Sequence, residues 1–252
     1  MLKKKGVYIL AGLLIVGAII FSAKSQNNVM KSILPVNTAY AQTLNEIETY
    51  MTSLMSEIEK GMNEQPELAM QGSPIAFIKS SDNYEKIVNL GLEAVKPLYD
   101  TLYEHKDAGL YEYILALAIE DITQEEFIYN AEYGWKNSLE FRMAFEERVN
   151  TVAFNVERIV NDTDLSDAQK VEKFKEEGVF AVSALITEYK KTDSIVPKEV
   201  IEEAIQSIAD KYDVSAISQN KETLNGKEME NFIIDNEPLF DSLVDLNGKA
   251  YQ

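Results

Sequence analysis

The sequence predicts an all-α protein made of antiparallel helical hairpins in an irregular array or bundle, behind an N-terminal export or anchor helix. Apolar residues recur at spacings of three and four along most of the chain, which is the period of an amphipathic helix. No segment shows convincing alternation of a half-buried strand. Glycine, proline and asparagine fall mainly where the periodic segments end.

The N-terminus has the pattern of an export signal. Lysines at positions 3–5 precede an uncharged run from Gly6 to Phe21. Ala23 and Ser25 are small residues at the −3 and −1 positions of a cleavage point before Gln26, so residues 1–25 are a secretory signal peptide in one interpretation. In the other they are a retained membrane anchor, although the run is shorter than the roughly 20 residues that span a bilayer comfortably. Either way we expect an extracytoplasmic protein, membrane-anchored or secreted, with residues 26–37 as a linker.

The net charge of the chain restricts the classes of partner that its surface can bind. The net charge is −18, and all 42 carboxylates follow Lys31. Nucleic acids and anionic lipid headgroups are poor partners for such a surface, whereas basic peptides, basic protein patches, amines and divalent cations suit it. A second explanation is that the acidity only keeps an exported protein soluble. The chain has no cysteine, so it folds on its core without disulfides or thiolate metal sites.

The first long helix is predicted from Thr38 to Met62. Its apolar residues recur at alternating spacings of four and three, at Tyr40, Leu44, Ile47, Met51, Leu54 and Ile58. This heptad seam over positions 40–58 fits a homodimeric stalk beyond the export segment. It fits equally well a helix whose seam packs against the helices that follow.

A helical hairpin is predicted next. A short helix starts at Ser81 or Asp82 and ends at Gly91, a natural residue after a helix C-terminus. The segment from Leu92 to Glu104 carries Pro97 in its interior, which predicts a kink or a new helix start. An amphipathic helix from Tyr111 to Ile122 returns antiparallel to it.

A long helix is predicted from Ser138 to about Asp162. It ends at the boundary between two regions, 38–162 and 163–252, and we expect these regions to share one core. The acidic stretch Asp162–Asp167 resembles the start of a calcium loop, but it lacks the glycine at the sixth position. Ser166 with Gln169 forms instead the capping box of a following helix. A final apolar helix is predicted to open at Asn236-Glu237-Pro238.

The hairpin pattern recurs after eighty-seven residues without a gap. The shared frame is E-K-I/F-x3-G-x2-A-V-x2-L. It comprises Glu85-Lys86-Ile87, Gly91, Ala94-Val95 and Leu98 in the first copy and Glu172-Lys173-Phe174, Gly178, Ala181-Val182 and Leu185 in the second. The second copy continues into an amphipathic helix over Lys198–Tyr212, so two α-hairpins of one kind are expected.

The first copy and its surroundings resemble a HEAT-like helical module of the kind found in extracytoplasmic proteins of Gram-positive bacteria. About fifty residues carry the resemblance: Ser73–Ile78, Tyr84–Gly91, Glu93–Val95 and Gly109–Ile119. It implies a solenoid-like scaffold with a binding role and supplies no catalytic residue. The long helix and irregular tail depart from a regular array, so a continuous concave solenoid is not implied.

The sequence offers little catalytic chemistry. His105 is the only histidine, in a hairpin connection where we expect it at the surface. Without cysteine or a second histidine, histidine-based triads, zinc sites built from several His or Cys residues and Cys–His pairs lack essential parts. The only catalytic groups left are paired carboxylates, such as Glu125-Glu126 or Glu146-Glu147, which could in principle serve glycoside hydrolysis. Adjacent side chains on a helix point about 100° apart, however, so such a pair does not converge on one substrate by itself. We therefore expect no enzyme, no cofactor and no metal centre.

One cluster suggests a binding surface. Aromatic residues gather with carboxylates over a short stretch, and the candidate partner-binding residues are Tyr111, Glu112, Tyr129, Tyr133 and Trp135. Rings beside carboxylates bind basic peptides or stack on sugars; alternatively, the rings seal the hairpin core and keep their hydroxyls in water. The sequence thus favours a scaffold presenting an acidic, tyrosine-rich face to a protein or basic peptide at the cell envelope. A cell-wall glycan binder or carboxylate-dependent glycan hydrolase is the alternative.

Overall fold

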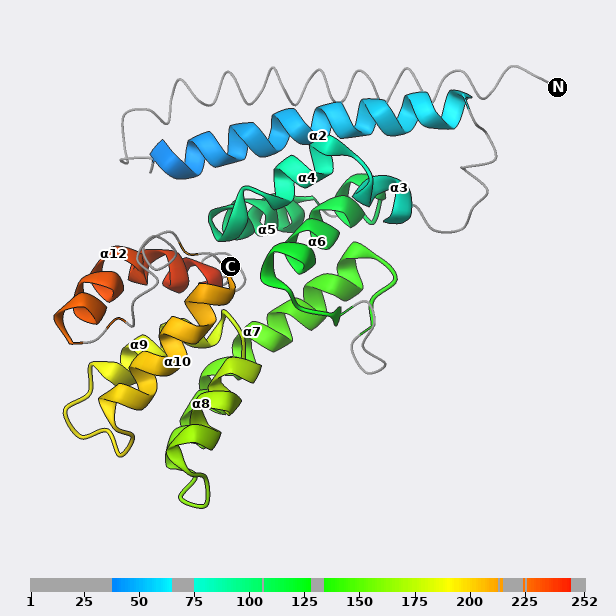
Figure 1. Ribbon diagram of the computed structural model, residues 1–252. Coiled ribbons are helices and arrows are strands. Elements are labelled where there is room, and N and C mark those ends of the chain that lie inside the picture. Colours follow the sequence, from blue (N-terminus) through cyan, green and yellow to red (C-terminus); the bar gives the residue numbers. More distant parts are fainter. Residues whose placement is uncertain are drawn as a thin grey trace. The chain divides into compact units, whose positions relative to one another are not determined.

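The described part of the chain is entirely helical. The computed structural model describes residues 38–64, 75–105, 107–127, 134–212, 214, 224 and 226–245. Over these residues no strand forms, and the all-α prediction is confirmed. The elements, labelled as in Figure 1, are α2 (Thr38–Glu64), α3 (Ile75–Lys79), α4 (Asp82–Val88), η2 (Gly91–Ala94), α5 (Val95–Glu104), α6 (Leu110–Thr123), α7 (Ser138–Asn161), α8 (Asp167–Glu176), α9 (Ala181–Tyr189), α10 (Lys198–Lys211) and α12 (Lys227–Val244).

The chain divides into two compact units, Met1–Gln42 and Thr43–Gln252. The expected export segment, residues 1–25, and the linker, residues 26–37, lie outside the described residues. Within the described ranges, no helix is both long and apolar enough to cross a membrane. In the second unit, buried residues from both sequence regions, 38–162 and 163–252, belong to one hydrophobic cluster.

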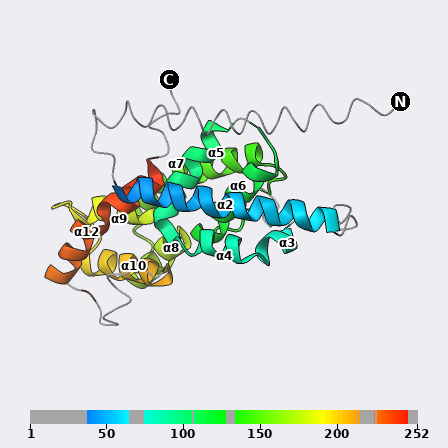
Figure 2. The same cartoon turned by 90° about the horizontal axis from the view of Figure 1, so that it is seen from above.

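Most of the apolar seam of α2, from Ile47 to Ile58, is buried within the chain. Ile47, Met51 and Leu54 are fully covered. The Glu57 carboxylate accepts hydrogen bonds from Ser81 Oγ and Asn83 Nδ2, both at 2.6 Å, which ties α2 to the start of α4 (Figure 2). Because this packing occupies the seam from Ile47 to Ile58, a homodimer through that part would have to displace the chain's own helices, whereas Tyr40 and Leu44 are only half-buried.

The first hairpin begins at a left-handed glycine. Gly91, with φ of +67°, follows α4 and opens the 3-10 turn η2. The α-helix resumes at Val95, so Pro97 is in the first turn of α5. There its missing N–H costs no hydrogen bond, because the first N–H groups of a helix have no partner within it. The predicted new helix start is confirmed, two residues before the proline.

The long helix α7 and the capping box were predicted from local signals and are confirmed. Asn137 caps α7 by accepting hydrogen bonds from the N–H groups of Leu139 and Glu140, both at 3.0 Å. Ser166 accepts from the Gln169 N–H at 3.4 Å, and Gln169 Oε1 accepts from the Ser166 N–H at 2.9 Å. One face of α7 packs against α6, α8 and α9 and so joins the two hairpin regions.

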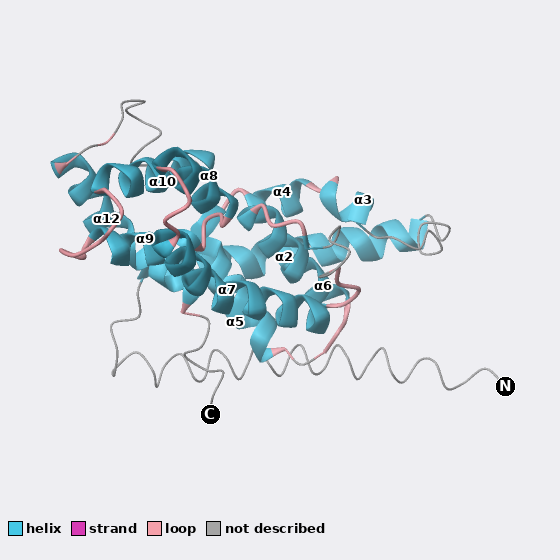
Figure 3. Ribbon diagram, turned by 90° about the horizontal axis from the view of Figure 1, so that it is seen from below, coloured by secondary structure: helices cyan, strands magenta, loops and turns pink. Residues whose placement is uncertain are grey.

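The last helix starts earlier than predicted. α12 begins at Lys227 and carries Pro238 in its interior, whereas the sequence suggested a start at Asn236. The apolar residues Met229, Phe232 and Ile233 are buried, and this packing supports helix well before the proline. In Figure 3 all described elements of the second unit are helices joined by loops.

Candidate functional site

Trp135, expected at a binding surface, lies in the core. Its Nε1–H donates a hydrogen bond of 2.5 Å to the buried Glu120 carboxylate of α6. Its ring packs against Phe141 and Tyr113, with centroids 5.3 and 4.9 Å away. The expectation of an exposed Trp135 is therefore corrected: the indole is buried because its polar edge has a partner inside the protein.

Glu112 is also buried, and its side chain caps the N-terminus of α6. Its carboxylate accepts a hydrogen bond from the Gly109 N–H at 3.0 Å and lies 3.0 Å from His105 Nδ1. Tyr111 is half-buried and stacks on the His105 ring at 5.3 Å. Glu112 is thus a capping residue. The remaining two candidates, Tyr129 and Tyr133, lie outside the described residues.

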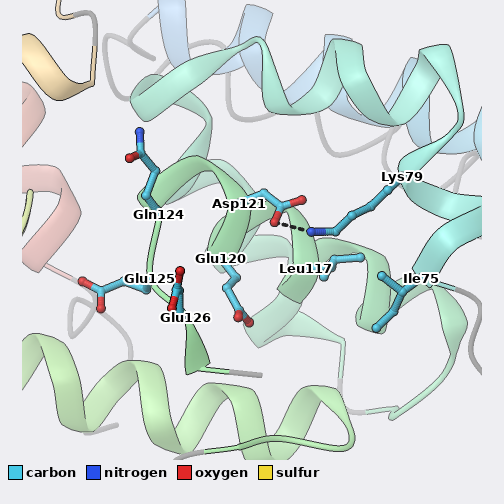
Figure 4. A pocket seen from close by; sticks show the side chains of 8 residues that line it. All are labelled: Ile75, Lys79, Leu117, Glu120, Asp121, Gln124, Glu125 and Glu126. Atoms are coloured by element: carbon cyan, nitrogen blue, oxygen red, sulfur yellow. Dashed lines mark hydrogen bonds and ion pairs between the residues drawn. The ribbon is translucent and has the colours of Figure 1, made fainter. Parts of the chain in front are cut away.

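Acidic side chains converge elsewhere, at the end of α6. Gln124 ends this helix in the left-handed conformation, with φ of +53°, and the chain turns there. A hollow of about 210 Å³ lies beside the turn (Figure 4). Lys79 and Asp121 form a 2.6 Å ion pair on one side of it, and Glu125 extends away from Lys79. The carboxylates that line this hollow are Glu120, Asp121, Glu125 and Glu126.

A second hollow adjoins the first because Glu125 and Glu126 line both. It measures about 360 Å³ and lies between the turn after α6, the middle of α7 and the end of α8. Its carboxylates are Glu125, Glu126, Glu147, Glu176 and Glu177. We call the two hollows together the acidic trough.

Arg148 of α7 organises the second hollow. Its Nη1 donates to Glu177 Oε2 at 2.8 Å and its Nη2 to the Glu177 carbonyl oxygen at 2.5 Å. Its Nε lies 3.4 Å from Glu125 Oε1. Burial raises the pKa of the Glu125 carboxyl, and the Arg148 charge offsets only part of this effect. One guanidinium thus ties the first hairpin region to the second.

Three carboxylates of the acidic trough have no such partner. Asp121 pairs with Lys79, Arg148 with Glu125 and Glu177, and Glu120 with Trp135. Among the residues that the structure describes, the remaining three are exposed and form no ion pair: Glu126, Glu147 and Glu176. They can therefore receive cations from a ligand.

The sequence pointed to parts of this trough. The pair Glu125-Glu126 lines both hollows, as a carboxylate site requires. The other pair separates: Glu147 lines the second hollow, whereas Glu146 accepts a hydrogen bond from the Tyr99 hydroxyl. The contribution of α8 was missed, and its only sequence signal is a further acidic pair, Glu176-Glu177, at a helix end. Among the described residues, no group of acidic or histidine side chains is arranged to hold a metal ion.

Comparison with known proteins assigns the chain to no family. No protein-family model, no curated protein and no solved structure matches it. Function must therefore be inferred from the residues of the acidic trough.

Proposed function

We propose that this protein is a non-enzymatic, extracytoplasmic helical scaffold of the HEAT-like kind, and that it binds a basic segment of a protein or peptide partner in the acidic trough. The observation that carries the proposal is the charge of the trough. Seven described carboxylates line it, against two described cations, Lys79 and Arg148. Like charges held close together raise the free energy of the unliganded surface, and a cationic ligand relieves this cost.

The shape and chemistry of the trough favour a peptide over a sugar. Sugar binding commonly uses an exposed aromatic face. Among the described residues that line the two hollows, Phe127 is the only aromatic one, and it is buried. Exposed carboxylates suit lysine ammonium and arginine guanidinium groups instead. The hollows are open at the surface, so side chains of an extended or helical segment can enter them while its backbone stays outside.

The extracytoplasmic location is part of the proposal and comes from the N-terminal sequence. Three lysines precede the uncharged run Gly6–Phe21, an arrangement that keeps the lysines inside and sends the rest across the membrane. The partner is then a basic segment at the cell envelope. The same run would hold the scaffold at the membrane if it is retained.

The test is binding of a fluorescently labelled octalysine peptide to the full-length chain, measured by anisotropy at several salt concentrations. The triple variant E126Q/E147Q/E176Q should weaken binding by about fivefold to tenfold, because each exposed pair is worth roughly 0.2–1 kcal/mol. A matched control, E59Q/E203Q/E228Q, changes three exposed carboxylates outside the trough and gives the same net charge.

The control decides between a site and a general charge effect. Binding should stay close to wild type in E59Q/E203Q/E228Q, and rising salt should weaken the wild type more than the trough variant. Equal losses in the two triple variants would show that only net charge matters. Release of sugar from a cell-wall glycan by the wild type, lost in E125Q, would favour the hydrolase alternative.

A further inference from the structure

A third hollow opens between α7 and α9, on a different side of α7 from the acidic trough. It measures about 380 Å³ and shares no lining residue with the two hollows of the trough. On α7, its lining residues lie about 150° around the helix axis from those of the second hollow. We call it the apolar hollow, because most of its lining is apolar. Its apolar lining includes Val149, Val152, Val156, Phe180, Ala184 and Val244.

The apolar hollow is deep enough to reach the core. Val149, Val152, Val156 and Phe180 line it and are at most 5% exposed, so they form its floor. Val244, at the end of α12, and the half-buried Ala184 of α9 complete the lining. An alkyl group that enters the hollow therefore removes apolar surface from water on several sides, which is the main source of affinity for an apolar ligand.

All but one of the polar side chains that line the apolar hollow have partners within the chain. Ser183 Oγ donates a hydrogen bond to Asp241 Oδ1 at 2.6 Å, and Thr187 Oγ1 donates to the Ser183 carbonyl oxygen at 3.1 Å. The Lys191 ammonium donates to Glu188 Oε2 at 2.6 Å. These groups need no ligand to satisfy them.

Glu157 is the exception, and it lies at one end of the apolar hollow. Its side chain is exposed and forms no ion pair with any residue that the structure describes. The hydrogen bond to Glu188 raises the pKa of Lys191, and the Glu157 charge adds to this effect, so the three ionisable groups lie near one another. Phe180 stacks on Phe145 at 5.4 Å, one helical turn before Val149. The hollow therefore has a charged end and an apolar end.

We propose that the apolar hollow binds a small aliphatic ammonium compound, whose alkyl chain covers the floor valines and whose ammonium group pairs with Glu157. The volume and the lining are those of a small-molecule site between helices, where a few polar groups fix the orientation of an otherwise apolar ligand.

Charge selects the ammonium group. The ionisable side chains that line the apolar hollow, Glu157, Glu188 and Lys191, sum to −1. An alkyl carboxylate would face Glu157 and would find Lys191 already paired, whereas a neutral alkyl compound would leave Glu157 without a partner. The net charge of the whole chain, −18, also attracts a cation and repels an anion.

The experiment titrates the full-length chain, carrying isotope-labelled valine methyl groups, with butylamine, pentylamine and hexylamine at pH 7. Nuclear magnetic resonance follows the valine signals. Those of Val149, Val152 and Val156 should shift saturably, and each added methylene should tighten binding about threefold. Hexylamine should bind about twofold to fivefold more tightly than hexanol, and hexanoate should bind most weakly.

Substitutions locate the ligand. E157Q should remove the advantage of hexylamine over hexanol, while E203Q, which changes an exposed carboxylate outside all three hollows, should keep it. A184L fills the apolar hollow and should abolish saturable binding, while A168L makes the same change on the exposed face of α8 and should not. Thermal unfolding checks the fold. Because Glu157 is exposed, E157Q decides the question even if A184L does not fold.

Other occupants of the apolar hollow would give different results. Displacement of hexylamine by octalysine would assign the hollow to lysine side chains of a partner. Binding that appears only in a chain ending at Asp245 would assign it to residues 246–252, and self-association that hexylamine reverses would assign it to a second copy. Each of these results overturns the proposal, as do unshifted valine signals or equal affinities for hexylamine and hexanoate.

This proposal and the proposed function fail separately. The apolar hollow and the acidic trough share no residue, so E126Q/E147Q/E176Q should weaken octalysine binding and leave the affinity for hexylamine unchanged. A parallel loss of both affinities would overturn the assignment of hexylamine to the apolar hollow.

Discussion

Gly91 and Gly178 adopt the same left-handed backbone at equivalent positions of two hairpins, with φ of +67° and +65°. Each follows a short helix, α4 or α8, and precedes α5 or α9. The frame predicted from the sequence therefore has the same turn at the same place in both copies. Its apolar members are also buried in both: Ile87, Ala94, Val95 and Leu98 in the first, Phe174, Ala181, Val182 and Leu185 in the second.

Replacing either glycine by alanine should destabilise the protein by about 1–2 kcal/mol, because a Cβ disfavours positive φ. The two sites differ in their surroundings. A Cβ on Gly91 meets nothing within 4 Å, whereas one on Gly178 lies 3.4 Å from Glu125 Oε1. We expect G178A to cost at least as much as G91A in urea denaturation. An unchanged midpoint for G91A would contradict the role of the left-handed turn.

The buried Trp135–Glu120 hydrogen bond should contribute to stability. Trp135→Phe removes the indole donor from a carboxylate that is 3% exposed, and it also leaves space in the core. We expect a loss of about 1–3 kcal/mol in the free energy of unfolding. Circular dichroism must follow the transition, because Trp135 is the only tryptophan.

A conservative change at the partner separates the hydrogen bond from packing. Glu120→Gln keeps an acceptor for the indole N–H and nearly the same volume. It should therefore cost less than Trp135→Phe. A larger loss in Glu120→Gln would show that the charge of Glu120 matters more than its bond to Trp135.

Long helices were predictable because many residues repeat the same signal. The apolar period of α7 extends over many residues and predicted a start near Ser138, and the structure adds the Asn137 cap at that point. α12 was mislocated because Pro238 resembles a helix start, and only burial of Met229 and Phe232 against other elements extends the helix before it.

The site was less predictable than the fold because its contacts are long-range. Burial of Trp135 depends on Glu120, and burial of Glu112 on its own helix start at Gly109. Arg148 of α7 pairs with Glu125, which follows α6, and with Glu177, which follows α8. These residues are far apart in the sequence, so no local pattern predicts the contact.

The raised pKa of Glu125 should make stability depend on pH. Because burial raises this pKa in the folded state, the native protein binds the proton more tightly than the unfolded chain does. The ionised carboxyl therefore costs stability, and the cost disappears as pH falls through the folded pKa. It is fully absent once the pH is below the ordinary value of 4.5.

The measurement compares wild type with Glu125→Gln, whose amide cannot ionise. The difference in unfolding free energy, wild type minus variant, should rise as pH falls from 7 toward 4.5. Taking this difference cancels the titration of carboxyls common to both proteins. A difference that falls over this range would mean that the Arg148 ion pair, and not burial, dominates the pKa.

Arg148 should be the most sensitive residue of the trough. Arg148→Met keeps much of the aliphatic stem but leaves two partly buried carboxylates, Glu125 and Glu177, close together without the cation between them. Breaking a buried ion pair from one side costs about 3–5 kcal/mol, and partial exposure here places the expected loss near the lower end. Urea denaturation followed by circular dichroism measures it.

A combined variant tests whether charge explains that loss. If the cost comes from uncompensated carboxylates, R148M/E125Q/E177Q should be more stable than R148M, although each neutral substitution adds a change of its own. The wild type should remain the most stable of the three, because Arg148 also donates to the Glu177 carbonyl oxygen. No recovery in the triple variant would indicate that Arg148 stabilises the trough through this backbone contact and its packing, and the charge-based account of the junction between the two hairpin regions would then be wrong.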